Sequence, residues 1–387
     1  MKTLGSPGPV RAQWWNWFFG AGQQQIGVVL MLDIPREWEE LTFAVLPRAS
    51  LIILIGSTDT GKSTLTTYLA NQAVRRGYKT AVVDADVGQS DIGPPATIGM
   101  GILFDEVKCL GEVPLADFYF VGSVSPYGRL TEMVVGTKKM VDRAYAFSAQ
   151  RVIVNTTGLV QGGLGQALKH HKVDLLRPEA IVALQREREL ETLLKMWEIL
   201  GYCVCRLPAI PEVYRRSSEL RASFRQRRWR EFFGGARLRK VPLGRIIVRG
   251  APIFRGMPFG AESREKIRGL VGQEVLWAEE VEDTGIVVTP DFVRRELLSE
   301  AAAFLGIRRL ARLAPDCLAG RVVSMVGELG RPLSLGCIAR VDYDKGELLV
   351  YTPYQGEEDI RLIEFGRVRL RAAEILPSDL ALSPAQG

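Results

Sequence analysis

The amino-acid sequence predicts an α/β fold, in which a doubly wound parallel sheet is followed by a C-terminal, mostly-β domain. Between residues 51 and 235, short apolar runs without strict alternation are separated by stretches of helical periodicity, which is typical of a parallel sheet covered on both faces. Beyond this region the apolar segments shorten and turn residues become frequent, which favours β structure. The predicted organisation is a short N-terminal segment over 1–47, an α/β domain over 48–235 and a β-rich domain over 236–387.

The individual elements follow from the same patterns. The wholly apolar run Leu51–Ile55 predicts a buried strand, and the segment from Lys62 to Arg76 predicts a helix that Gly77 ends. Further strands of the α/β domain are expected at 80–83, 118–121, 151–154, 180–184 and 202–205. The β-rich domain is expected to contain strands at 245–248 and 285–288, a helix at 290–305 and a hairpin at 341–351.

Composition limits the class of protein. The chain has 387 residues, of which 47% are hydrophobic and 24% charged, so fibrous, collagenous and disordered classes are excluded. The formal net charge is +6, and arginine carries it, with 38 Arg against 12 Lys. Arginine forks match phosphate and stack on bases, which favours an anionic partner such as nucleic acid. Proteome-wide base composition or thermophily produces the same ratio, so this preference stays open.

Cysteine, histidine and hydropathy exclude further classes. The five cysteines are scattered and odd in number, which argues against a disulfide framework, and no cluster has zinc spacing. The only histidines, His170 and His171, are adjacent, so a histidine base or histidine-based metal site is not expected. No segment reaches the ~18 uninterrupted apolar residues of a membrane span, the Trp-rich stretch 14–19 included. We therefore expect a cytoplasmic protein that binds no membrane.

A segment between the first strand and the first helix matches the pattern G-x4-G-K-[ST] of a phosphate-binding loop, the P-loop. Its glycines let backbone N–H groups turn toward phosphate oxygens, and the helix N-terminus adds positive charge. Lys62 is expected to reach the β- and γ-phosphates, and the Ser63 hydroxyl to coordinate Mg²⁺. The predicted nucleotide-binding residues are Gly56, Ser57, Thr58, Asp59, Thr60, Gly61, Lys62, Ser63 and Thr64. No Asn-Lys-x-Asp motif of GTPases occurs, so we expect ATP, or no base selection among nucleoside triphosphates.

Two acids, Asp84 and Asp86, directly follow the strand over 80–83. An acid at this edge of a neighbouring parallel strand is where a P-loop protein places its Mg²⁺ partner or its base. Residues two apart on a strand point to the same face. We therefore predict that Asp84 and Asp86, with Ser63, bind the metal; the alternative is a pair of solvated carboxylates.

Arginines gather just before the end of the α/β domain. They are Arg215, Arg216, Arg221, Arg225, Arg227, Arg228 and Arg230. Arg221, Arg225 and Arg228 share one helical face and repel each other unless an anion compensates. Nucleotide phosphates, the charge of a transition state and a nucleic-acid backbone are suitable anions. The alternative is a solvated basic helix.

Four stretches resemble, in order and spacing, the P-loop polynucleotide 5′-hydroxyl kinases, relatives of the pre-mRNA cleavage-complex and rRNA-processing kinases with archaeal and bacterial members. They are Gly56–Thr64, Asp84–Gln89 (Asp-Ala-Asp-Val-Gly-Gln), Asn155–Gly158 (Asn-Thr-Thr-Gly) and Arg216–Gly235, and the block Tyr119–Pro126 is also similar. The resemblance covers residues 35–235 well and the remainder loosely. It implies a lid formed by the arginine-rich segment 212–235.

The resemblance implies transfer of the γ-phosphate of ATP, with Mg²⁺, to the 5′-hydroxyl of RNA or DNA. In this family pattern, Asp86 orients or deprotonates the attacking hydroxyl, and Gln89 lies near the metal or the acceptor. Thr156 and Gly158 form a clasp beside the reacting phosphates. The residues expected to take part in catalysis are Lys62, Asp86, Thr156, Arg221 and Arg225, and those expected near the acceptor are Gln89, Thr156 and Gly158.

The resemblance is incomplete at two places. Leu159 follows the clasp glycine where eukaryotic relatives often have an aromatic residue, and their N-terminal β domain is reduced here to a short segment. Two other functions stay open: an ATP-binding scaffold, and a regulatory ATPase with water as acceptor. The expected partners are RNA or DNA with a 5′-hydroxyl end, together with RNA-processing or repair proteins.

Overall fold

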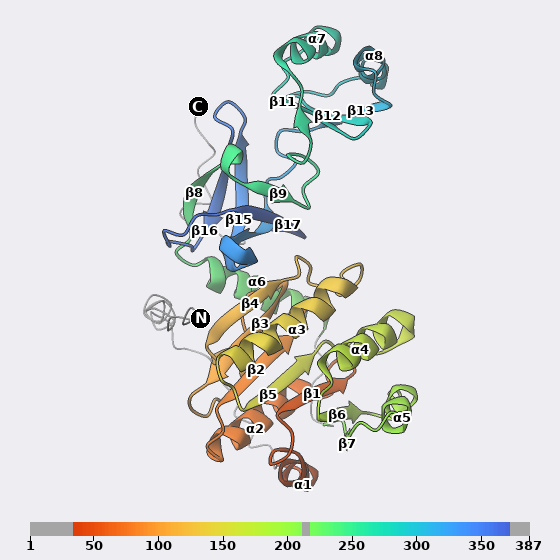
Figure 1. The fold of residues 1–387 in the computed structure, drawn as a ribbon, viewed down its shortest axis with the longest axis vertical. Coiled ribbons are helices and arrows are strands. Elements are labelled where there is room, and N and C mark those ends of the chain that lie inside the picture. Colours follow the sequence, from red (N-terminus) through yellow and green to blue (C-terminus); the bar gives the residue numbers. More distant parts are fainter. Residues whose placement is uncertain (1–33, 211–216, 372–387) are drawn as a thin grey trace, which may run out of the picture.

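The computed structural model describes residues 34–210 and 217–371 (Figure 1). The Trp-rich stretch 14–19, Arg215, Arg216 and the C-terminal tail, on which sequence predictions fall, lie outside the described residues. Within the described ranges, no helix is long and apolar enough to cross a bilayer.

The first half of the chain forms a seven-stranded sheet with the order β4-β3-β2-β5-β1-β6-β7. Strands β2, β5, β1, β6 and β7 are parallel, whereas β3 and β4 are antiparallel to their neighbours. The strands are β1 (Leu51–Gly56), β2 (Thr80–Ala85), β3 (Thr97–Leu103), β4 (Leu115–Phe120), β5 (Arg151–Thr156), β6 (Ala180–Gln185) and β7 (Val204–Pro208). This α/β sheet confirms the predicted fold class.

Helices cover both faces of this sheet. The helices of this half are α1 (Arg36–Val45), α2 (Lys62–Arg75), α3 (Leu130–Ala146), α4 (Gly162–Leu176) and α5 (Glu191–Ile199). Alternate side chains of β1 point to opposite faces: Ile53 packs in one core with α3, α4 and α5, and Ile52 in a second core with α1 and α2. The apolar strands therefore lack the alternation of a half-exposed sheet because both of their faces are buried.

The antiparallel strand β3 was missed in the sequence, and β4 was wrongly expected to be parallel. Glycines interrupt the β3 pattern, which weakens a strand prediction. At Gly101 an added Cβ would lie 2.6 Å from the carbonyl oxygen of Pro114, so the close approach of the chain explains the glycine. The last strand, β7, begins later than expected and ends at Pro208, which an edge strand tolerates.

The second half of the chain forms two further sheets. The six-stranded sheet has the order β8-β16-β15-β14-β17-β9, and the four-stranded sheet the order β10-β11-β12-β13. The strands are β8 (Arg237–Pro242), β9 (Ile247–Arg249), β10 (Met257–Pro258), β11 (Trp277–Val281), β12 (Thr284–Val288), β13 (Arg309–Leu313), β14 (Arg321–Val326), β15 (Pro332–Asp342), β16 (Glu347–Thr352) and β17 (Leu362–Arg369). The predicted hairpin is the β15–β16 pair.

The four-stranded sheet belongs to a small α/β unit inserted into the β-rich half. Helices α7 (Ala261–Val271) and α8 (Arg295–Leu305) pack on it around their own apolar core. Helix α8 connects the parallel strands β12 and β13, as the predicted helix at 290–305 suggests. Helix α7 was missed, because few of its residues are apolar. Figure 1 shows this unit at the end of the molecule away from the seven-stranded sheet.

Helix α6 (Ser218–Phe233) joins the two halves (Figure 1). Trp229 and Phe233 are buried in a cluster with Phe120 from β4 and Leu335 from β15. The apolar side of this arginine-rich helix is thus fixed between the two sheets, which leaves its arginines on the side of the P-loop and the loop after β2.

Candidate active site

The P-loop lies between β1 and α2, as predicted. Gly61 has φ = 94°, in the left-handed region that favours glycine, and forms the N-cap of α2. A Cβ at Gly61 would lie 2.8 Å from Cγ1 of Ile210, so a side chain there would also clash. Thr60 is fully buried, and its hydroxyl donates to the carbonyl oxygen of Ser57 at 2.9 Å. These contacts hold the loop in a tight turn at the N-terminus of the helix.

Lys62 lies within this turn. Its Nζ donates a hydrogen bond to the carbonyl oxygen of Ser57 at 2.6 Å, and the residue is buried. Burial lowers the pKa of Lys62 to about 8, while the carboxylates of Asp86 and Asp59 act in the opposite direction. A desolvated cation at a helix N-terminus, beside backbone N–H groups, is suited to bind phosphate oxygens.

Arg186, after β6, braces the P-loop from outside. Its Nη1 donates to the Ser57 hydroxyl at 3.3 Å and to the carbonyl oxygen of Thr58 at 3.2 Å. Glu189 accepts a hydrogen bond from the same Ser57 hydroxyl at 3.1 Å. The sequence left the segment 185–189 open between adenine recognition and a solvated helix start, and the structure gives Arg186 contacts to the loop itself.

Asp84 is fully buried at the end of β2. One carboxylate oxygen accepts hydrogen bonds from the backbone of Asp91 at 2.7 Å and Ile92 at 3.1 Å, and the other from Asn155 Nδ2 at 3.1 Å. Burial, then the nearby carboxylates of Asp91 and Asp86, raise the pKa of Asp84 to about 8, against the effect of these backbone N–H groups. Asp84 therefore holds the following loop, and direct metal binding, expected from the sequence, does not fit this arrangement.

Asp86 lies two residues further on and is half-buried. Its Oδ1 accepts hydrogen bonds from the backbone of Gly88 at 3.1 Å and Gln89 at 3.2 Å, which fixes the carboxylate at the start of the loop. Asp86 lies near enough to act on the charges of Lys62 and of the buried Lys172. The structure thus brings Asp86, Gln89 and the P-loop lysine to one edge of the sheet.

Asn155 connects the acids to the P-loop. Its amide donates to Asp84 Oδ1 at 3.1 Å and lies 3.4 Å from the hydroxyl of Ser63, an exposed residue. A hydroxyl, a fixed carboxylate and nucleotide phosphates form an all-oxygen donor set of the kind Mg²⁺ takes, with water completing the shell. Within the described ranges no group of three or more His, Cys, Asp or Glu side chains is placed to hold a metal by itself. Ser63 and Asp86 are the candidate ligands of a metal that would enter with the nucleotide.

The end of β5 and the loop after it, residues 155–158, touch the P-loop directly. A Cβ at Gly158 would lie 2.6 Å from the backbone nitrogen of Thr58, so only glycine permits this approach. The side chain of Thr156 points away from this contact: it is fully buried, and its hydroxyl donates to the carbonyl oxygen of Leu54 at 2.7 Å. This position of Thr156 does not support the expected contact of its side chain with substrate. Of the two clasp residues, Gly158 is the one that lies beside the P-loop.

Lys169, which the sequence analysis missed, supports this loop. The residue is fully buried on α4, and its Nζ donates to Thr156 Oγ1 at 2.8 Å and to the carbonyl oxygen of Thr157 at 2.5 Å. Burial, and next the charge of Lys172, lower its pKa well below the usual value. A neutral amine still has two protons to donate, so both hydrogen bonds persist without the charge. Lysine is rarely buried completely, so a lysine at an apolar position of the α4 pattern is the sequence feature that could have identified Lys169.

Replacing Lys169 by methionine is expected to lower kcat for the phosphoryl transfer that the family resemblance implies by roughly 10- to 100-fold. The reason is that the segment beside the P-loop loses the two hydrogen bonds that Lys169 donates to it. Lys172→Met is the matched control: Lys172 is equally buried on the same helix, and its Nζ has no hydrogen-bond partner among the described residues. Steady-state kinetics of both variants measure the difference. Equal losses of kcat would show that Lys169 contributes only to packing.

Lys172 is expected to make stability depend on pH. Burial lowers the pKa of its amine from 10.5 to about 7, so between these values the unfolded chain binds a proton that the folded chain does not. The contribution of Lys172 to the stability of the wild type therefore rises with pH through this window. Lys172→Met removes the effect, and its free energy of unfolding should exceed that of the wild type by roughly 2–4 kcal/mol at pH 7 and by less than about 2 kcal/mol at pH 9. Urea denaturation at both pH values measures this gap; a gap that grows with pH contradicts the assignment.

The arginine helix α6 faces the same edge of the sheet. Arg221 donates to the carboxylate of Asp59 in the P-loop at 2.7 Å, and Arg228 to the carbonyl oxygens of Asp91 at 2.8 Å and Gly93 at 3.0 Å. Arg225, between them, has no hydrogen bond or ion pair among the described residues. Burial and the neighbouring Arg221 lower its pKa. Of the three arginines on this face, Arg225 is the guanidinium available for an anion.

A cavity of ≈ 570 Å³ opens beside the N-terminus of α2. Ser63 and Thr64 of the P-loop line one side, Trp38 of α1 another, and Ile210 follows β7. Its volume lies in the range of roughly 300–1,000 Å³ that is usual for small-ligand sites. The phosphate loop therefore has a nucleoside-sized space at its side.

A family model described as "mRNA cleavage and polyadenylation factor CLP1 P-loop" matches residues 56–235. A polyribonucleotide 5′-hydroxyl-kinase of Pyrococcus furiosus is 32% identical over 346 residues, which cover 88% of this chain and 94% of that protein. A polyribonucleotide 5′-hydroxyl-kinase of Methanocaldococcus jannaschii is 31% identical over 323 residues, 82% of this chain and 86% of the relative. These alignments include both halves of the fold.

Among solved structures, the chain is similar to Clp1p in its complex with Pcf11p. The TM-score is 0.58 at 14% identity, and the match covers 86% of this chain and 78% of that chain. At this identity the likeness shows the fold, a P-loop α/β sheet with a separate mostly-β domain.

Proposed function

Because this chain belongs to the family of the archaeal polyribonucleotide 5′-hydroxyl-kinases, and a Clp1 P-loop model matches its residues 56–235, we propose that it transfers the γ-phosphate of ATP to the 5′-hydroxyl of RNA. The observation that carries the proposal is the meeting of Lys62, Asp86 and the Gly158 loop at one edge of the sheet. Phosphoryl transfer needs positioning and charge stabilisation rather than a histidine, and this edge supplies both.

In the proposed reaction, the P-loop backbone and Lys62 bind the β- and γ-phosphates, and the cavity beside Thr64 accepts the nucleoside. Ser63 and the phosphate oxygens would hold Mg²⁺, which would neutralise phosphate charge, so that the second oxygen of Asp86 stays available to the acceptor. The fixed carboxylate of Asp86 accepts a hydrogen bond from the 5′-hydroxyl and takes its proton as the oxygen attacks the γ-phosphorus. ADP leaves as the bond between its β-phosphate oxygen and the γ-phosphorus breaks.

The lid arginines have separate roles in this proposal. Arg221 connects α6 to the P-loop through Asp59, and Arg225, which has no ion pair among the described residues, meets the negative charge of the phosphoryl group in transfer. Because ATP is the donor, we propose that the protein acts in the cytoplasm. We also propose RNA-processing or repair proteins as its partners.

Arg225→Ala is expected to lower kcat by roughly 10- to 100-fold, with a smaller change in the KM for ATP, because its charge acts mainly in the transition state. Arg227→Ala is the matched control on the same helix, since the Arg227 guanidinium lies 5.3 Å from the Phe224 ring and pairs with Glu231 at 3.7 Å. Initial rates at varied ATP concentration separate the two parameters. A rise in the KM for ATP with an unchanged kcat would show instead that Arg225 binds the nucleotide and does not act on the transferred group.

The experiment that tests the function compares four acceptors: matched RNA and DNA oligonucleotides, each with a 5′-hydroxyl or a 5′-phosphate. With γ-labelled ATP and Mg²⁺, label should appear on the 5′-hydroxyl RNA and on neither 5′-phosphate oligonucleotide. The 5′-hydroxyl DNA shows whether the acceptor sugar matters. Equal labelling of 5′-phosphate ends would place the acceptor elsewhere and exclude the proposed reaction.

A further inference from the structure

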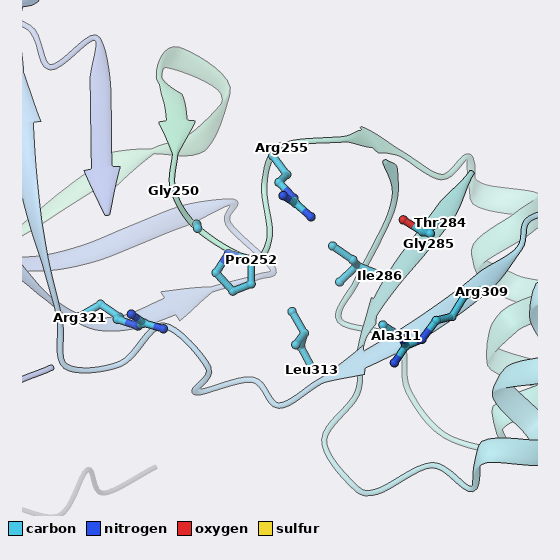
Figure 2. A pocket seen from close by; sticks show the side chains of 11 residues that line it. Gly250, Pro252, Arg255, Thr284, Gly285, Ile286, Arg309, Ala311, Leu313 and Arg321 are labelled. Atoms are coloured by element: carbon cyan, nitrogen blue, oxygen red, sulfur yellow. The ribbon is translucent and has the colours of Figure 1, made fainter. Parts of the chain in front are cut away.

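A second cavity, of ≈ 560 Å³, lies between the six-stranded sheet and the small α/β unit, and no residue of the phosphate site lines it (Figure 2). Its walls come from the segment after β9, from β12 and β13, and from the start of β14. Three arginines are among the residues that line it, Arg255, Arg309 and Arg321, and no acidic residue is. Figure 2 shows them on different sides of the same space.

These guanidinium groups have no carboxylate partner among the described residues, in contrast to Arg268 and Arg308 of the small α/β unit. Arg255 and Arg309 are exposed, and neither side chain has a hydrogen bond or ion pair among the described residues. Arg321 donates one bond to the carbonyl oxygen of Gly366 at 3.1 Å, while its Nε is buried without a partner. The buried Glu279 lies under the loop and accepts bonds from Phe254 and Trp277, so it is not exposed to neutralise them.

A series of close contacts connects one wall of the cavity, at Arg321, to the loop that holds Asp86. Gly88, bound to Asp86, approaches the carbonyl oxygen of Val124, because a Cβ there would lie 3.1 Å from it. In the same loop, Gly122 accepts a hydrogen bond from the backbone of Arg367 at 2.6 Å. The neighbouring Gly366 is the residue that Arg321 binds.

We propose that this arginine-lined cavity binds the phosphate backbone of the acceptor RNA downstream of its 5′ end. The inference rests on the proposed function, since that function places the 5′ terminus at Asp86. From there the strand runs over the loop 122–127 and β17 to the cavity. Guanidinium forks bind phosphate oxygens in two-point contacts, and an apolar wall such as the half-buried Pro252 makes no base-specific hydrogen bond. The β-rich half thereby extends the acceptor site to longer RNA.

The test uses the full chain and the double variant Arg255→Gln/Arg309→Gln. Its KM for a 5′-hydroxyl RNA of about 20 nucleotides should rise roughly tenfold, while its KM for a 5′-hydroxyl dinucleotide and its kcat stay at wild-type values. The control Arg268→Gln/Arg308→Gln removes the same charge from the same unit, at guanidinium groups that pair with Glu265 and Asp283, and should behave as the wild type.

Direct binding separates this inference from the proposed function. Fluorescence anisotropy with a 5′-phosphate RNA of the same length needs no catalysis, and the double variant should weaken binding and lower the slope of log K against log salt by about 1.4. An unchanged KM and salt slope would overturn the inference, as would an equal loss for dinucleotide and long RNA. If the wild type binds this RNA with the predicted dependence but labels no acceptor, the proposed function fails and the cavity assignment stands.

Discussion

Lys62→Ala should reduce kcat/KM for phosphoryl transfer by at least about 10³-fold, which corresponds to about 4 kcal/mol of transition-state stabilisation. Lys62 is the buried cation inside the P-loop, and its Nζ is held by the Ser57 carbonyl oxygen at 2.6 Å. Phosphate oxygens would replace that carbonyl when ATP binds. Alanine removes the charge that follows the γ-phosphate as negative charge develops on its oxygens.

The lower kcat/KM of Lys62→Ala should come from the chemical step and not from unfolding of the protein. Only one loop hydrogen bond of Lys62 disappears, so the thermal midpoint of Lys62→Ala should stay within a few degrees of the wild type. Lys138→Ala, which removes an exposed lysine paired with Asp142 on α3, is the matched control and should keep full activity. Substantial transfer by Lys62→Ala would remove the P-loop from the reaction as described.

Asp86→Asn should lower kcat by roughly 10²- to 10³-fold while the Kd for ATP changes less than about threefold. Asparagine keeps an oxygen that accepts the two backbone hydrogen bonds from Gly88 and Gln89, so the loop should keep its geometry. The substitution removes the negative charge and the basicity that take the proton from the attacking hydroxyl. Equilibrium dialysis for ATP and initial rates for transfer measure the two quantities separately.

Near-full activity of Asp86→Asn would contradict the assignment and would make Asp84 the better acid. The structure argues against this outcome, since both oxygens of Asp84 already accept hydrogen bonds and the residue is fully buried. Asp84→Asn is expected to act differently: its oxygen can keep the bonds from Asp91 and Ile92, but its NH₂ group would then face the donor Nδ2 of Asn155. A lowered thermal midpoint would accompany its loss of activity.

Local patterns in the sequence were sufficient to predict the parallel core and the P-loop. The wholly apolar strand 51–55 and the helix from Lys62 follow from residue type and spacing, and both have these positions in the structure. The antiparallel strand β3 could not be predicted in this way, because its glycines are explained only by the chains that pack against them. The helix α7 and the two-sheet form of the C-terminal half depend likewise on tertiary packing.

The same distinction between local patterns and tertiary packing applies to the site. Motifs place Lys62, Asp86 and Gly158 near one another, because carboxyl ends of parallel strands meet at one edge of the sheet. Spacing alone could not separate Asp84 from Asp86, since the two are expected on one strand face and differ in burial and hydrogen bonding. Nor could it show that Thr156 points into the core, or that Lys169 from the next helix binds it.

The most direct test of the central claim follows the label and the free phosphate in one reaction. γ-Labelled ATP, Mg²⁺ and a 5′-hydroxyl RNA are incubated with the wild type, and labelled RNA and inorganic phosphate are quantified against ATP consumed. We predict one labelled 5′ end for each ATP consumed, little inorganic phosphate, and neither product with Lys62→Ala. ATP consumption with all label in inorganic phosphate would identify an ATPase, and tight ATP binding without consumption would identify a scaffold; either result contradicts the account.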